Sequence, residues 1–192
     1  MTRPSILVFA GSTRKGSYSK QLAKLCHKIL QDNQAEANFI DLRDFPMPLY
    51  EGDLEIEQGI PKNALKFRDL LKSHPAFLIS SPEYNSSISG VLKNAIDWAS
   101  RPIKGEPNLV CFMGKIVTLV STSPGRLGGM RALVTVRSIL NNIGSFVLPD
   151  QLCISFADKA FNPEGNLLDE NQQKTLETIC QNFMKISEKL VQ

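Results

Sequence analysis

The chain has 192 residues, the length of one domain, and we expect a single domain over residues 1–192. Its 22 basic and 19 acidic residues give a net charge of +3, and the basic residues are scattered, which argues against a nucleic-acid-binding face. The four cysteines form no CxxC pair and only two histidines are present, so no metal site is expected. Without a signal peptide or a long apolar run, we expect a cytoplasmic protein with no membrane span.

The chain alternates between short apolar runs and amphipathic stretches. An uninterrupted apolar run at residues 6–10 predicts a strand buried on both faces, and helical spacing of apolar side chains predicts a helix over 17–32. Further strands are expected at residues 38–42, 76–80, 116–120 and 152–156. Further helices are expected at residues 61–73, 89–100, 130–143 and 176–190. Proline and glycine predict irregular structure at residues 43–60 and 101–114.

Five strands joined by helical crossovers predict an α/β fold, a doubly wound parallel sheet with helices on both faces. The best-known order for five such strands is 2-1-3-4-5. In that order the first and third strands are neighbours, and the chain reverses direction between them. Ligands bind beyond the carboxyl ends of the strands at such a point. The loops that follow the first and third strands are therefore the predicted site.

The loop after the first strand, residues 11–19, is rich in hydroxyl groups and opens directly into a helix. A helix N-terminus stabilises an anion, and Arg14 can add a charge-assisted hydrogen bond. Four side chains can donate hydrogen bonds to phosphate oxygens: Ser12, Thr13, Ser17 and Ser19. The GxGxxG motif is absent, and Ser17 stands where a P-loop needs lysine, so the loop favours a monophosphate. The alternative is a Ser/Thr-rich helix cap without a ligand.

The loop after the third strand, residues 80–90, combines Pro82 with small residues that allow close backbone approach. A flat heteroaromatic ring can lie here, and the following helix N-terminus would stabilise negative charge on the pyrimidine side of a reduced flavin. Asn85 is interpreted as a ring contact or as a turn residue. Tyr84 is a ring neighbour or an interface aromatic. Glu83 is more simply a solvent-exposed carboxylate than a catalytic one.

Three segments together resemble the NADPH-dependent FMN reductase family, which includes quinone, azo-dye and chromate reductases and has a flavodoxin-like fold. They are GSTRKGS at 11–17, PEYNSSISGVLKNAIDW at 82–98 and STSPGRLGGMRA at 121–132. The resemblance covers nearly the whole chain. It differs at Ser19, where asparagine is usual, and at Ser89, where proline is common.

The resemblance implies a site for FMN. The phosphate would be held by Ser12, Arg14, Ser17 and Ser19, with Thr13 and Tyr18 in the same loop. The isoalloxazine ring would be lined by Pro82, Glu83, Tyr84 and Asn85. The other side of the ring would be approached by Ser123 and Gly125. No protein catalytic residue is expected, because the cofactor carries the chemistry.

The function that the resemblance implies is an NAD(P)H-dependent oxidoreductase that works in two half-reactions. NADPH or NADH would reduce the bound FMN, and a small acceptor such as a quinone, azo compound, chromate or free flavin would then be reduced. The resemblance also implies a homodimer or homotetramer, with residues 41–50 as a subunit contact or a packed surface loop. The alternatives are an electron carrier like flavodoxin, which the positive net charge disfavours, and a flavin-based redox sensor.

Overall fold

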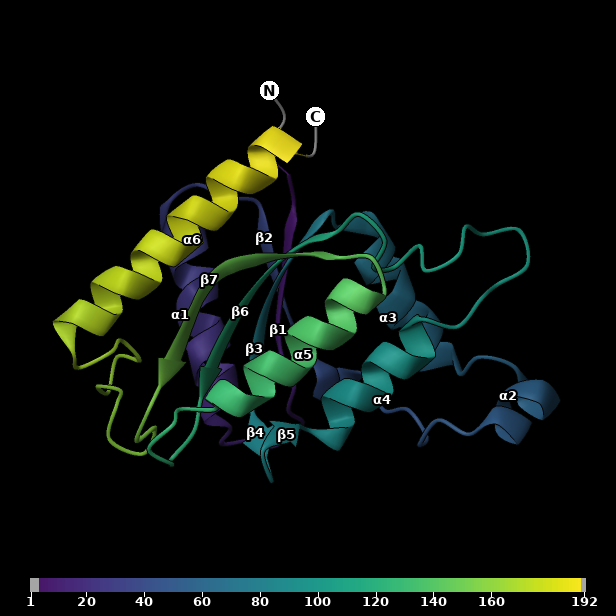
Figure 1. The fold of residues 1–192 in the computed structure, drawn as a ribbon, viewed down its shortest axis with the longest axis horizontal. Coiled ribbons are helices and arrows are strands. Elements are labelled where there is room, and N and C mark those ends of the chain that lie inside the picture. Colours follow the sequence, from purple (N-terminus) through teal and green to yellow (C-terminus); the bar gives the residue numbers. More distant parts are fainter. Residues whose placement is uncertain (1–3, 191–192) are drawn as a thin grey trace.

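The computed structural model describes residues 4–190 and shows a five-stranded parallel sheet between two layers of helices (Figure 1). The strand order β2-β1-β3-β6-β7 confirms the predicted doubly wound topology, with β6 and β7 as the fourth and fifth strands. The strands are β1 (Ile6–Ala10), β2 (Ala37–Asp41), β3 (Ala76–Ser81), β6 (Ile116–Thr122) and β7 (Phe146–Ile154). The carboxyl ends of β1 and β3 are neighbours, because Ala10 pairs with Ser80.

Two helices cover one face of the sheet and three cover the other, and each layer encloses its own apolar core. The first pair is α1 (Tyr18–Asp32) and α6 (Glu170–Leu190). The other layer holds α3 (Lys62–Ser73), α4 (Gly90–Ala99) and α5 (Met130–Asn142). The side chains of β1, β3 and β6 are buried along their whole length, as strands between two helical layers must be. Cys26, Cys180 and Trp98 are fully buried.

The prediction of irregular structure at residues 43–60 is wrong in part. A short 3-10 helix, Leu42–Asp44, and helix α2, Gly52–Gln58, lie in this segment. The carboxylate of Glu51 caps α2 by accepting hydrogen bonds from the backbone N–H groups of Asp53 and Leu54. All residues of α2 are described and none is buried, so the sequence has no apolar stripe that could have predicted this helix. It projects from the body of the molecule (Figure 1).

The fifth strand was predicted at residues 152–156, but β7 begins at Phe146 and ends at Ile154. It is an edge strand whose residues are mostly half-buried or exposed, and Pro149 lies within it. Its pairing with β6 shifts register between Val117 and Leu119. Partial burial and the register shift remove the continuous apolar run by which the other strands were recognised.

Candidate functional site

The loop from β1 to α1 presents buried hydroxyl groups at a helix N-terminus. Ser17 is the N-cap of α1, and its hydroxyl accepts a hydrogen bond from the backbone N–H of Lys20 at 3.3 Å. The hydroxyls of Ser17 and Ser19 lie 2.8 Å apart, and both residues are buried, as is Ser12. The first backbone N–H groups of a helix have no partner within the helix, so this end of α1 can accept an anion.

Around these hydroxyls the loop carries exposed groups. Thr13 and Arg14 are exposed, and the Arg14 guanidinium lies 5.6 Å from the centre of the half-buried Tyr18 ring. A second cation, Lys20, was not predicted as part of the site. It is buried in the first turn of α1 and forms an ion pair with Asp41 at 2.7 Å. Asp41 ends β2, and no local sequence signal connects it with Lys20.

The loops after β1 and β3 are joined at Gly11. A side chain at this position would place its Cβ 2.9 Å from Leu92 Cβ and 3.1 Å from Pro82 Cδ, so only glycine fits. The Ser89 hydroxyl donates to the Gly11 carbonyl at 2.6 Å and accepts from the backbone N–H of Leu92 at 3.1 Å. Ser89 therefore caps α4 and ties it to the loop between β1 and α1.

The segment after β3, which the sequence predicts to be a loop, forms a short hairpin. Strands β4 (Glu83–Tyr84) and β5 (Ser87–Ile88) pair in antiparallel fashion. The two turn residues, Asn85 and Ser86, have φ angles of 50° and 67°. Positive φ at both central positions is typical of a tight hairpin turn, for which asparagine is well suited. The hairpin leaves Tyr84 55% exposed at its tip.

The carboxylate of Glu83 does not face solvent. It accepts hydrogen bonds from the backbone N–H groups of Arg131 at 2.9 Å and Ala132 at 3.2 Å, at the start of α5. The Arg131 guanidinium adds hydrogen bonds of 2.7 and 3.0 Å. The hairpin is thereby fastened to the beginning of α5. The carboxylate of Glu83, which was predicted to line the ring, is therefore bound to Arg131 and Ala132.

The loop from β6 to α5, residues 123–129, forms the third part of the site. A Cβ at Gly125 would meet only the Ser123 hydroxyl, at 3.6 Å, so the space beside this backbone is open. A Cβ at Gly128 would lie 2.8 Å from the backbone of Ile154, and one at Gly129 would lie 2.9 Å from Ser121 Cβ. Both glycines also have positive φ, so the loop packs tightly against β6 and β7 at its far end only.

Cys153, on the edge strand, lies behind this loop. Burial is the main cause that raises the pKa of the Cys153 thiol, a hydrogen bond with Ser121 lowers this pKa, and the negative charge of Glu83 raises it.

These residues fit FMN. The buried hydroxyls and the helix N-terminus suit a phosphate dianion, and the backbone at Gly125 leaves open space beside it. A cavity of about 380 Å³ adjoins the loop between β1 and α1 at Thr13. Its remaining walls are mostly apolar and are formed by Leu42, Arg43, Phe45, Pro46, Met47, Val91, Asn94 and Ala95.

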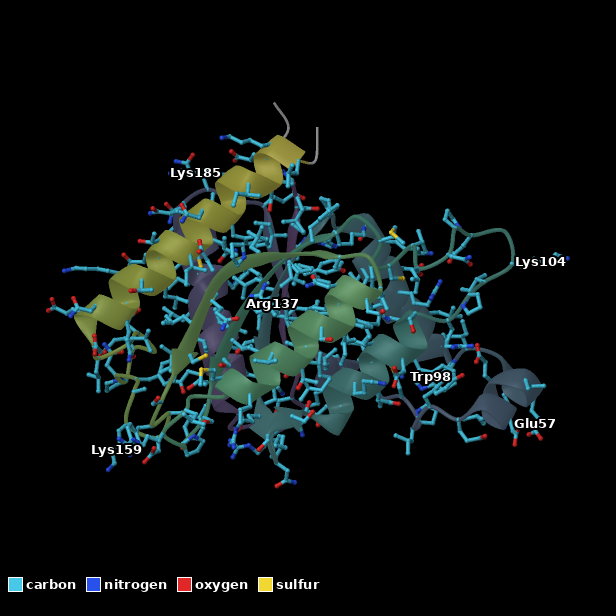
Figure 2. All side chains as sticks on the ribbon, in the orientation of Figure 1. Glu57, Trp98, Lys104, Arg137, Lys159 and Lys185 are labelled. Carbon is cyan, nitrogen blue, oxygen red and sulfur yellow. The ribbon has the colours of Figure 1, made fainter. Side chains whose placement is uncertain are left out.

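Two residues of the motif at 82–98 hold the backbone of residues 48–50 beside this cavity, a role that the sequence does not predict. Asn94 donates to the Pro48 carbonyl at 2.9 Å and accepts from the backbone N–H of Tyr50 at 2.7 Å. Trp98 extends from α4 toward the segment that leads to α2 and donates to the same Pro48 carbonyl at 2.8 Å (Figure 2). Glu55 of α2 accepts a hydrogen bond from the Arg101 guanidinium, with 2.9 Å between Nε and Oε2.

Burial is not the main influence on Tyr50 in this network. Its hydroxyl donates to Glu55 at 3.0 Å, and this hydrogen bond is the largest cause of the raised pKa of the phenol.

Within residues 4–190, no helix is both long and apolar enough to cross a membrane. In the same residues, no three His, Cys, Asp or Glu side chains are grouped so as to hold a metal ion.

Comparison with known proteins agrees with this geometry. Residues 4–159 match the family described as NADPH-dependent FMN reductase. A probable NADPH:quinone oxidoreductase of Oryza sativa subsp. japonica is 33% identical over 180 residues, which covers 89% of this chain and 82% of the relative. An NAD(P)H-dependent FMN reductase of Pseudomonas aeruginosa is 34% identical over 174 residues, 90% of this chain and 89% of the relative.

Among solved structures, the flavoenzyme NAD(P)H:(acceptor) oxidoreductase FerB from Paracoccus denitrificans superimposes with a TM-score of 0.81. It is 30% identical in sequence, and the match covers 97% of this chain and 98% of that one.

Proposed function

The chain belongs to the NADPH-dependent FMN reductase family, and from this we propose that residues 12–19, 82–85 and 123–125 hold FMN for electron transfer from NAD(P)H to a quinone. The observation that carries the proposal is the meeting of three loops at the carboxyl edge of the sheet. Ser89 joins the first loop to α4, and Glu83 joins the second loop to the start of α5. The loops are thereby fixed relative to one another before any ligand arrives.

The phosphate end of the cofactor is assigned to the start of α1. The hydroxyls of Ser12, Ser17 and Ser19 are already buried, so their side chains lose little rotamer freedom when they donate to phosphate oxygens. Arg14 is exposed and can approach from the solvent side, where its charge complements a dianion. The charge of a neighbouring cation, Lys20, is balanced by its ion pair with Asp41, so Lys20 is not proposed as a direct phosphate ligand.

The ring is assigned to the space between the hairpin and the open backbone at Gly125. The chemistry that FMN supplies when bound is hydride acceptance from a reduced nicotinamide and delivery of two electrons to an acceptor. The hairpin and the backbone at Gly125 would hold the ring between them. Glu83 is engaged by α5, so it is not proposed as a catalytic acid.

A quinone is the acceptor class that the surroundings favour. Several relatives are named quinone reductases, among them one from Escherichia coli that is 30% identical over 167 residues. The cavity beside Thr13 has mostly apolar walls, which suit a flat apolar ring better than a chromate ion. Arg43 in its lining can meet a quinone carbonyl oxygen.

A second copy of the chain is proposed to cover the arm formed by residues 46–58. Leu49 and Ile56 on this arm are 80% and 84% exposed, although the arm is anchored by Asn94, Trp98 and Arg101. Anchored, exposed apolar groups are typical of an interface. Light scattering that shows a monomer would refute the proposed contact with a second copy.

The four free cysteines suit a reducing compartment, which supports the cytoplasm as the location.

Titration of the purified protein with FMN, followed by NADPH oxidation with a benzoquinone, tests the proposed function. Replacement of Ser17 or Ser19 by alanine removes a hydroxyl donor to a charged group, so the dissociation constant of FMN should rise about 10-fold or more. Ser73→Ala removes an exposed hydroxyl at the end of α3 and is the matched control. A wild-type protein that takes up no FMN, or that oxidises NADPH equally well without FMN, would overturn the proposal.

A further inference from the structure

We propose that Glu83 is a positioning residue. From the hairpin it caps helix α5 and so connects the two loops assigned to the flavin ring, and its negative charge lowers the reduction potential of the flavin. The inference rests on the proposed FMN site. It concerns a carboxylate that the sequence analysis interpreted as a solvent-exposed group or a ring neighbour.

The contacts of Glu83 use both carboxylate oxygens. Oε2 accepts from the backbone N–H groups of Arg131 and Ala132, and Oε1 accepts from Nε and Nη2 of Arg131. The Glu83 side chain is only 9% exposed, whereas that of Arg131 is 53% exposed. Four hydrogen bonds to one little-exposed carboxylate form a specific arrangement, unlike an ordinary surface ion pair.

The sequence at the start of helix α5 supplies no side-chain cap of its own. Its N-cap is Gly129, which has no side chain to accept a hydrogen bond, and its φ of 90° lies in the left-handed region. In the first turn of α5, which is described completely, no acidic residue is present. The carboxylate that complements the partial positive charge of this helix end comes instead from Glu83, 48 residues before Arg131 in the sequence.

The cap connects the two loops assigned to the ring. Glu83 belongs to β4, next to Pro82 and Tyr84, whereas α5 follows directly on the loop that contains Gly125. The four hydrogen bonds therefore set the separation of the hairpin from the 123–129 loop. A ring held between them depends on this separation for its fit.

The same carboxylate balances the local charge. The N-terminus of α5 and the Arg131 guanidinium are both positive, and Glu83 offsets them. Two-electron reduction increases the negative charge on the pyrimidine side of a flavin. Without the charge of Glu83 the surroundings are more positive, so the reduced form is stabilised. Without the charge of Arg131 the carboxylate is less well balanced, so the reduced form is destabilised. The two substitutions should thus act in opposite directions.

Spectroelectrochemical titration of the FMN-loaded protein tests the inference. We expect Glu83→Gln to shift the equilibrium toward reduced flavin about tenfold, which is about 30 mV for a two-electron couple. Arg131→Gln should shift it the other way by a smaller factor, because this side chain is half exposed and screened by solvent. Glu170→Gln removes the same charge from an exposed position on α6 and is the matched control, with no shift expected.

The outcomes separate this inference from the proposed function. A wild-type protein that binds no FMN overturns both. A wild-type protein that binds FMN, together with a Glu83→Gln variant whose potential is unchanged or lowered, overturns this inference alone. Shifts of the same sign in Glu83→Gln and Arg131→Gln also overturn it, because they indicate general loosening. If Glu83→Gln does not fold, Arg131→Gln decides the question, and an unchanged or raised potential refutes it.

Discussion

Replacing Gly11 with alanine would test whether the loops after β1 and β3 are in direct contact. The added Cβ would lie 2.9 Å from Leu92 Cβ and 3.1 Å from Pro82 Cδ, whereas carbon atoms in contact prefer about 3.5–4.0 Å. None of these atoms is the mobile end of a flexible side chain, since Leu92 Cβ is fixed to the backbone of α4 and Pro82 is a ring. The backbone must therefore move.

Overpacking of this kind costs about 2 kcal/mol. For a chain of this length, such a loss lowers Tm by about 4–8 °C. The movement would also separate the phosphate loop from the hairpin, so FMN affinity should fall together with stability. Neither Gly11 nor its neighbour in the same loop, Gly16, has a positive φ, so the argument does not involve backbone strain.

Thermal unfolding of FMN-free protein gives the stability term without any contribution from the cofactor. Gly16→Ala is the matched control, because a Cβ there meets no atom within 4 Å and the substitution should be neutral or stabilising by up to about 1 kcal/mol. If Gly11→Ala melts within 1 °C (about 0.3 kcal/mol) of Gly16→Ala, the close contact is absent in solution and the reasoning is refuted.

Three further predictions concern the scaffold around the site. Trp98→Phe removes the hydrogen bond to Pro48 and part of a fully buried ring, so unfolding free energy should fall by about 1–2 kcal/mol in denaturant melts; no change would contradict the clamp. The pKa of the Glu106 carboxyl is lowered, mainly by its hydrogen bond with Lys72, so the ionised carboxylate stabilises the fold above the ordinary pKa of 4.5, and this stabilisation is lost as the pH falls below that value. Glu106→Gln should therefore flatten the acid side of a Tm–pH profile, and an unchanged profile would exclude a stabilising Glu106–Lys72 pair. Burial raises the pKa of the Cys26 thiol, so thiol reagents should label it slowly in the native protein and rapidly in urea; fast native labelling would contradict its burial.

The fold was predictable from the sequence wherever burial leaves a simple pattern. A strand covered on both faces reads as a mostly apolar run, and residues 6–10, 76–81 and 116–122 are buried along their whole length in the structure. The failures have the opposite character. Helix α2 buries none of its described residues, and β7 lies at the sheet edge, half-buried and interrupted by Pro149. Without a buried face, periodicity has no physical cause.

The candidate site was predictable to the extent that its chemistry is local. Hydroxyl groups before a helix and a proline after a strand are neighbours in sequence, so the loops at 11–19 and 80–90 could be identified directly. The pairs that fix these loops are distant in sequence. Glu83 meets Arg131, Ser89 meets Gly11, and Lys20 meets Asp41. One sequence contains no record of such pairs, because each partner alone is an ordinary polar residue.

These pairs also give a physical meaning to the long second motif. Pro82 to Asn85 border the space assigned to the ring, but several other members of the motif act on neighbouring segments. Ser89 reaches the phosphate loop, and Asn94 and Trp98 hold the segment before α2 through one carbonyl. The motif thus specifies where three separate parts of the chain stand around α4. A substitution at Trp98 should therefore loosen the wall of the cavity beside Thr13 while leaving the hydroxyl groups of the phosphate loop in place.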